Sequence, residues 1–170
     1  MKIINILIIH NKNPKDHDLF TNQAKAICKK LNDKIKIKIT WVVFPSHDTI
    51  NTKIESSEFI DSREYEDIFE IIKHVKPDIV QTWMFHSDLI GGIIAKYFGV
   101  KKIFWSEHAA NIKLLSFTVR IIVRICSILS YIIPNAVVCC ALSTKAMLLK
   151  NGYSKKKMTV INNGCDTEYY

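Results

Sequence analysis

Short apolar runs of strand length alternate along the chain with longer segments in which apolar residues recur every three or four positions. Such runs and such periodic segments predict buried β-strands and amphipathic helices, respectively. We expect strands at residues 3–9, 35–44, 79–83, 101–106, 136–141 and 158–162. We expect helices at residues 18–31, 61–75, 88–98, 112–133 and 143–151, and a polar loop at residues 45–57. This alternation predicts an α/β fold, a Rossmann-like parallel sheet with helices on both faces.

Residues that begin or end helices support several of these boundaries. Gly99 and Gly152 stand where two helices should stop, and glycine readily adopts the left-handed conformation of a helix C-terminus. Ser143 is placed to cap the helix that follows the strand at residues 136–141. The pair Gly91–Gly92 predicts close packing of its helix against the sheet.

Length, charge and cysteine content narrow the class of protein. A chain of 170 residues suits one globular domain, which we place at residues 1–162. The net charge of +8 favours anionic partners, although a solvated lysine-rich surface would give the same balance. The five cysteines include no C-x-x-C pair, which favours a reducing cytoplasm. The apolar N-terminal stretch is short and lacks a small-residue cleavage site, so a first strand is expected there rather than a signal peptide.

Chemically informative residues follow the predicted strands, at the edge where parallel α/β sheets bind ligands. His86 and Asp88 come directly after the strand at residues 79–83, and either Ser87 or Asp88 could cap the next helix. Backbone N–H groups at the start of that helix could bind an anion or a hydroxyl. The other interpretation is that His86 only hydrogen-bonds within the turn.

Ser106, Glu107 and His108 follow the strand at residues 101–106. A carboxyl group beside an imidazole can bind sugar hydroxyls or move a proton. The alternative is a loop pair whose hydrogen bonds are satisfied locally. The spacing of His86, Glu107 and His108 matches no familiar metal site, so no metal ion is expected.

Other common ligand classes lack their sequence signals. No Gly-x-Gly-x-x-Gly follows the first strand, and neither a Walker-type loop nor a Gly-x-Ser-x-Gly elbow is present, so no cofactor is expected. Lys34, Lys36 and Lys38 alternate along one strand without interleaved aromatic residues, so no nucleic-acid partner is expected.

The longest apolar segment, at residues 112–133, is interrupted by Lys113, Arg120 and Arg124. These charges argue against a membrane-spanning helix. They fall near one side of a helix, which fits a basic amphipathic helix lying on an anionic membrane surface. The other interpretation is a helix packed against the sheet with its arginine edge in solvent, and both stay open at this point.

An ordered set of segments resembles the family 4 glycosyltransferases of the GT-B fold. The segments are QTWMFHSDLIGG at residues 81–92, IFWSEH at 103–108, PNAVV at 134–138, Ser143, Gly152-Tyr153, and KMTVINNGCD at 157–166. Together they cover roughly residues 75–170. It is their order and spacing, more than any single motif, that carries the resemblance.

The resemblance implies the N-terminal, acceptor-binding domain of a retaining enzyme that works without a metal. Such enzymes move a sugar from a nucleotide sugar to a glycan or lipid-linked acceptor in surface polysaccharide biosynthesis. It implies a cytoplasmic protein that lies peripherally at the inner face of the cell membrane, with residues 112–133 in the region of membrane contact.

The resemblance also implies roles for individual residues. His108 would lie near the donor sugar, and Glu107 would line the same cleft, so we assign both a catalytic role. His86, Asp88, Ser106 and Asn163 are the predicted substrate-binding residues. The predicted membrane contacts are Lys113, Arg120 and Arg124.

The chain departs from the family pattern in two places. The loop at residues 11–15 has no glycine pair. We also expect the C-terminal domain that holds the nucleotide diphosphate to be missing. We therefore expect residues 163–170 to begin an interdomain linker, nucleotide-sugar binding only with a C-terminal domain, and little transfer by this chain alone. The alternative function is a non-catalytic membrane-surface or ligand-binding module of Rossmann-like fold.

Overall fold

The computed structural model of the chain describes residues 3–10, 36–43, 57–61, 65–109, 111–112 and 116–162. The strands are β1 (Ile3–His10), β2 (Lys36–Val43), β3 (Ser57–Asp61), β4 (Ile79–Trp83), β5 (Lys102–Glu107), β6 (Ala136–Cys139) and β7 (Met158–Val160). The helices of these ranges are α2 (Tyr65–Val75), α3 (Met84–Tyr97), α4 (Phe117–Leu129), α5 (Leu142–Lys150) and the 3-10 helix η3 (Lys155–Lys157). The helix predicted at residues 18–31 lies outside the described residues.

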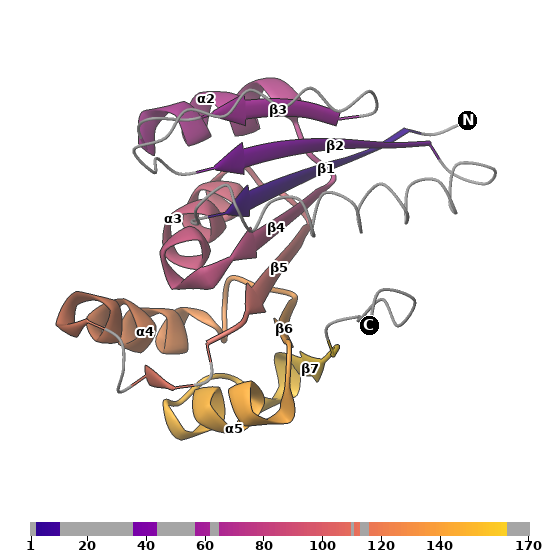
Figure 1. Ribbon diagram of the computed structural model, residues 1–170. Helices are drawn as coiled ribbons and strands as arrows, with labels where there is room; N and C mark the ends of the chain where they lie inside the picture. The colour runs from indigo at the N-terminus through magenta and orange to yellow at the C-terminus, as the bar shows by residue number, and fades with distance from the viewer. Residues whose placement is uncertain are drawn as a thin grey trace, which may run out of the picture.

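The strands form one seven-stranded parallel sheet in the order β3-β2-β1-β4-β5-β6-β7. Figure 1 shows them fanning from β3 at one edge to β7 at the other. The order runs outward in both directions from the β1–β4 pair, which is therefore the topological switch point where such sheets bind ligands. At its carboxyl end, His10 of β1 pairs in register with Trp83 of β4. The predicted α/β, Rossmann-like parallel sheet is confirmed.

The N-terminal edge of the sheet differs from the sequence prediction. Residues 57–61 form strand β3, whereas their polar pattern predicts the end of a loop and the start of a helix. β3 pairs with β2 alone and lies at the sheet edge. An edge strand needs only one neighbour and commonly carries charged residues, so hydrophobic patterning does not reveal it.

The predicted helix caps are partly wrong. α5 begins at Leu142, so Ser143 lies inside the helix, and the N-cap residue Ala141 makes no side-chain hydrogen bond. α4 is shorter than the predicted segment 112–133 and begins after Ser116, whose hydroxyl accepts a hydrogen bond from the Val119 amide at 3.4 Å. An N-cap residue needs a non-helical backbone conformation, which residue type alone does not determine.

The C-terminal helix signals are confirmed. Gly99 and Gly152 have φ angles of 72° and 89°, in the left-handed region that favours glycine. After α3, the Val100 amide donates to the Ala95 carbonyl at 3.0 Å and the Gly99 amide donates to the Lys96 carbonyl at 3.0 Å. These bonds close the helix and turn the chain back into β5.

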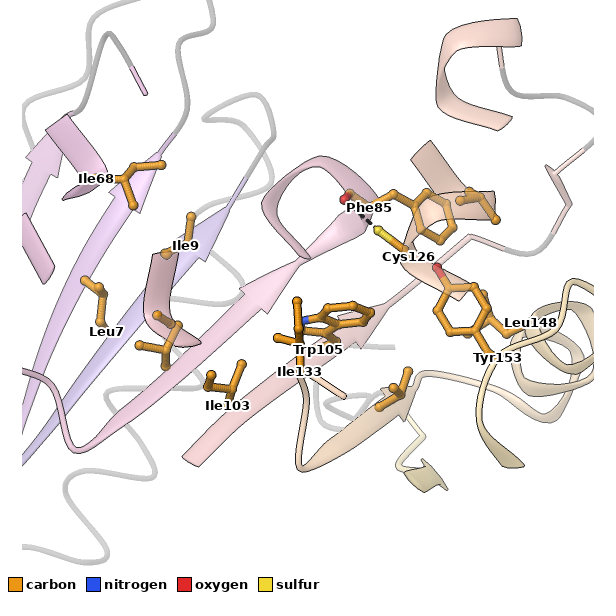
Figure 2. Packing of buried hydrophobic residues seen from close by; sticks show 14 of the residues in the cluster. Leu7, Ile9, Ile68, Phe85, Ile103, Trp105, Cys126, Ile133, Leu148 and Tyr153 are labelled. Atoms are coloured by element: carbon orange, nitrogen blue, oxygen red, sulfur yellow. Dashed lines mark hydrogen bonds between the residues drawn. The ribbon is translucent and has the colours of Figure 1, made fainter. Parts of the chain in front are cut away.

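The core is built around Trp105 of β5, which is fully buried (Figure 2). α3 approaches the sheet so closely that only glycine fits at two positions. A Cβ atom at Gly92 would lie 2.7 Å from Trp105 Nε1, and one at Gly91 would lie 2.7 Å from Ile9 Cδ1 and 3.1 Å from Thr82 Cγ2. The close packing predicted from the glycine pair is confirmed, and it fixes α3 over the ends of β1, β4 and β5.

Candidate functional site

The candidate site lies at the carboxyl edge of the sheet, beside the β1–β4 switch point. β4 passes into α3 without a loop, because Met84 follows Trp83 as the first helical residue. Met84 has a φ angle of 71°. Non-glycine residues adopt this left-handed conformation at a cost of about 1–2 kcal/mol, and such strain is common at functional sites. The sharp turn brings the first turn of α3 next to the end of β4.

Two rings stack at this edge. The indole of Trp83 and the imidazole of His108 have ring centroids 4.8 Å apart and planes 15° apart. Trp83 ends β4 and His108 directly follows β5, so the stack joins the ends of neighbouring strands. Both side chains are partly exposed. An aromatic face beside an imidazole is suited to pack against a sugar ring and to hydrogen-bond its hydroxyls.

His86 lies in the first turn of α3 and is half-buried. Burial lowers the pKa of His86 below its ordinary value, so its imidazole is neutral at physiological pH. A neutral imidazole offers one hydrogen-bond donor and one acceptor. This residue is therefore suited to bind a hydroxyl rather than to pair with a charge.

A buried polar layer lies beneath the same edge. The Thr82 hydroxyl donates a hydrogen bond to Asp88 Oδ1, which joins β4 to α3. Gln81 Nε2 donates to Ser106 Oγ at 2.9 Å, which joins β4 to β5. The exposed fraction is 0% for Asp88, 0% for Glu107 and 2% for Ser106. These side chains support the strand ends from inside the protein.

Burial raises the pKa of both carboxyl groups in this layer. The pKa of Asp88 rises to about 8, although hydrogen bonds from Glu107 and Thr82 act in the opposite direction. For Glu107, burial is the largest cause and the charge of Asp88 adds to it, so its pKa lies well above the ordinary range. The pair therefore holds at least one proton at neutral pH.

The structure brings five of the predicted site residues to one edge but at two depths. His86 and His108 are partly exposed there, and Asp88, Ser106 and Glu107 are buried beneath them. Ser87 and Asp88, the predicted helix caps, lie inside α3 instead, because the helix begins at Met84. The catalytic and substrate-binding roles assigned to these residues stay predictions.

Helix α4 presents both apolar and basic side chains to solvent. The large exposed apolar residues of this helix are Phe117, Ile121, Ile125 and Ile128. Arg120 and Arg124 are exposed beside them, and Arg120 Cζ lies 5.8 Å from the centroid of the Phe117 ring. In the part of the chain that the structure describes, no helix is long and apolar enough to cross a membrane. Lys113 and Asn163 lie outside that part.

The described residues form a surface pocket of about 660 Å³ at the opposite, amino edge of the sheet. It lies between the ends of α2 and α3, with Ile4, Phe98 and Val100 among its apolar residues and Lys76 and Lys101 among its basic ones. None of the predicted site residues lines it. Among the residues that the structure describes, no group of histidine, cysteine, aspartate and glutamate side chains is arranged to hold a metal ion.

The sequence places Trp83 at the ligand-binding edge, but sequence reasoning assigned it no role and did not single out Thr82. Both belong to an apolar strand, where an aromatic or a threonine side chain is ordinary. The available signal was the position of Trp83 as the last residue before a helix, at a strand end. The stack on His108 depends on the pairing of β4 with β5, which the sequence does not display.

Comparison with known proteins gives one family. The model of Glycosyltransferase Family 4 matches residues 23–169. No curated protein sequence matches the chain.

Solved structures resemble the fold at low sequence identity. HepE from Anabaena, in complex with UDP and glucose, has a TM-score of 0.68 and 12% identity over 98% of this chain and 46% of its own. The apo form of the lipopolysaccharide outer core galactosyltransferase WaaB has a TM-score of 0.69 and 13% identity over 95% and 46%. The UDP-GlcNAc 2-epimerase from Methanocaldococcus jannaschii has a TM-score of 0.56 and 16% identity over 94% and 46%.

This chain thus spans less than half the length of the structures that it resembles. Because one of them is an epimerase, the fold alone does not select a reaction. The Glycosyltransferase Family 4 match covers Trp83, His86 and His108 together with the buried layer beneath them. The chain belongs to glycosyltransferase family 4, and its fold is that of one Rossmann-like half of the GT-B architecture.

Proposed function

We propose that this chain serves in the transfer of a sugar from a nucleotide-sugar donor to a glycan or lipid-linked acceptor, as the N-terminal, acceptor-binding domain. The observation that carries the proposal is the family match over residues 23–169, within which Trp83 stacks on His108 at the carboxyl edge of the sheet and His86 lies in the first turn of the helix after β4. Ligands of open parallel sheets bind at this place.

The chemistry of the edge supports a sugar ligand. Sugars present hydroxyl groups around a ring whose C–H faces pack well on aromatic surfaces. Here the stacked rings of Trp83 and His108 offer the surface, and the neutral imidazole of His86 offers a donor and an acceptor. In the proposed complex, His108 contacts the transferred sugar and His86 contacts the acceptor.

The names of the similar structures suggest which substrates to test first. HepE was solved with UDP and glucose, and WaaB acts on the lipopolysaccharide outer core. We therefore propose a UDP-sugar as the donor and a surface-glycan precursor as the acceptor. The nucleotide would be held by a second Rossmann domain, so this chain by itself should transfer little sugar.

A transfer assay tests the proposed function. The full chain is incubated with UDP-glucose or UDP-galactose and a lipid-linked sugar acceptor, both alone and with a separately supplied C-terminal domain of family 4. We expect transfer only with the second domain present. Absence of transfer in every combination, or epimerisation of UDP-GlcNAc instead, would contradict the proposal.

The exposed face of α4 supports a second proposal, that the chain docks on an anionic membrane on the cytoplasmic side. Its outward apolar residues would lie among the lipid headgroups, and Arg120 and Arg124 would pair with lipid phosphates. Charge complementarity favours this occupant because the chain carries a net charge of +8. A lipid-linked acceptor would then reach the site from the same surface.

Reversing both arginine charges should weaken membrane binding. For the double variant Arg120→Glu and Arg124→Glu, we expect roughly 10-fold or greater loss of co-sedimentation with vesicles that contain phosphatidylserine, since each basic residue near such a surface contributes about 1 kcal/mol. The matched control is the double variant Lys101→Glu and Lys102→Glu. It makes an equal charge change at exposed positions on the amino edge of the sheet. Equal losses for both double variants, or none for the arginine pair, would refute docking through α4.

A further inference from the structure

We propose that Asp88 and Glu107 share a proton in the folded protein, and that this buried carboxyl pair positions the ends of β4 and β5 and the start of α3, where Trp83, His108 and His86 lie. The pair lies beneath the site described above, so its functional importance rests on the proposed function. The existence of the shared proton does not rest on the proposed function, because the proton is detected in the protein without any ligand.

The geometry leaves no place for two ionised carboxylates. Both side chains have an exposed fraction of 0%, and the two carboxyl groups contact each other. Asp88 Oδ1 accepts a hydrogen bond from the Thr82 hydroxyl. Asp88 Oδ2 and both Glu107 oxygens have no donor among the described residues if both groups are ionised. A proton on Glu107 supplies the missing donor, so the pair forms one carboxyl–carboxylate hydrogen bond.

Weak acids surround the pair in the part of the protein that the structure describes. The ionisable groups that interact with one or both carboxyls come from α4, from β6 and the residue after it, and from the segment after α5: Cys126, Cys139, Cys140 and Tyr153. All of these are weak acids, and burial raises the pKa of the Cys126 thiol and the Tyr153 hydroxyl. Two buried negative charges in contact are costly, whereas a shared proton removes one of them.

The pair connects the elements that form the site. Asp88 lies one turn into α3, just after His86, and Glu107 ends β5 and is followed by His108. The Cys126 thiol of α4 lies 3.5 Å from the Phe85 carbonyl in the same first turn of α3, as Figure 2 shows. A hydrogen bond between Asp88 and Glu107 therefore fixes the start of α3 against the end of β5. Asp88 and Glu107 are positioning residues for the rings above them.

The shared proton predicts a specific pH dependence of stability. Because burial raises the pKa of both carboxyls, the folded protein holds protons that the unfolded chain has already released above about pH 4. The folded state then binds more protons than the unfolded state, so stability falls as pH rises. Since Glu107 keeps its proton well above the ordinary carboxyl range, the fall runs from about pH 4 through neutral pH. We expect the melting temperature to decrease steadily across this window.

Substitutions separate a shared proton from simple burial. Glu107→Gln keeps a hydrogen-bond donor for Asp88 and removes the titrating group, so it should flatten the pH dependence of the melting temperature. The NMR signals of the Trp83 and His108 rings should stay at their wild-type positions. Glu107→Leu keeps the volume but removes the donor, so it should lower the melting temperature more than Gln does and shift those signals. The matched control is Glu70→Gln, an exposed glutamate on α2, which should keep the wild-type slope.

A direct measurement keeps the proposal falsifiable if a variant does not fold. In wild-type protein, an NMR titration of the side-chain carboxyl carbons should show Glu107 still protonated at neutral pH. Ionisation of both groups near the ordinary value of about 4 would overturn the proposal, as would an unchanged slope in Glu107→Gln. A confirmed shared proton in a chain that fails the sugar-transfer assay would refute the proposed function and leave the carboxyl pair intact.

Discussion

Replacing His108 with alanine should lower sugar transfer by about 100- to 1,000-fold in the assay with the second domain, the usual effect of removing one donor aimed at a developing charge. His108 follows β5 at the switch-point edge, and its imidazole stacks on Trp83 with ring centroids 4.8 Å apart. The stack fixes the ring, so its nitrogen atoms reach one defined place at the edge. Loss of the imidazole removes the proposed hydrogen bond from His108 to the transferred sugar and leaves the fold in place.

The matched control for this variant is His74→Ala. His74 is an exposed histidine of α2 whose Nε2 lies 3.5 Å from a Glu70 carboxylate oxygen, away from the carboxyl edge. Transfer by His74→Ala should equal that of the wild type. If His108→Ala transferred sugar at the wild-type rate, the edge described here would not be the catalytic one.

Replacing Trp105 with alanine should lower the free energy of unfolding by about 3–5 kcal/mol, the range for a large buried aromatic residue. Trp105 has an exposed fraction of 0% and its indole fills the space that Gly92 leaves on α3. The cavity would lie directly between α3, which carries His86, and β5, which His108 directly follows. Urea unfolding followed by circular dichroism measures the loss.

Phe117→Ala serves as the comparison for Trp105. Phe117 is also aromatic but is 70% exposed on α4, so its loss should cost less than about 1 kcal/mol. Similar losses for the two variants would mean that the core is not centred on β5.

The sheet could be predicted from the sequence because its central strands are short runs rich in β-branched, aliphatic and aromatic residues. Residues 79–83 and the other buried runs have no competing pattern, and turn signals such as Gly99 mark where the helices end. β3 could not be predicted, because an edge strand is specified by its pairing with β2 rather than by its own apolar content. The early start of α3 was missed for a related reason, since Met84 adopts a conformation that its residue type does not indicate.

The sequence predicts where the site lies in the sheet, but not which of its side chains are buried. Polar residues at strand ends mark the carboxyl edge, and His86 and His108 do lie partly exposed there. Residue type alone suggests that Asp88 and Glu107 should also face the ligand, yet both are fully buried. Their burial depends on the close approach of α3 to the sheet and on the Thr82 hydrogen bond, which are tertiary features.

The most direct test of the central claim is to locate where a sugar binds on this chain. An isotope-labelled sample of the full chain is titrated with alkyl glycosides of glucose and galactose, which mimic the acceptor, and followed by NMR. We predict saturable shifts of the signals of Trp83, His86 and His108, with His108→Ala weakening the binding. Shifts confined to the pocket at the amino edge, near Phe98 and Val100, would contradict the account.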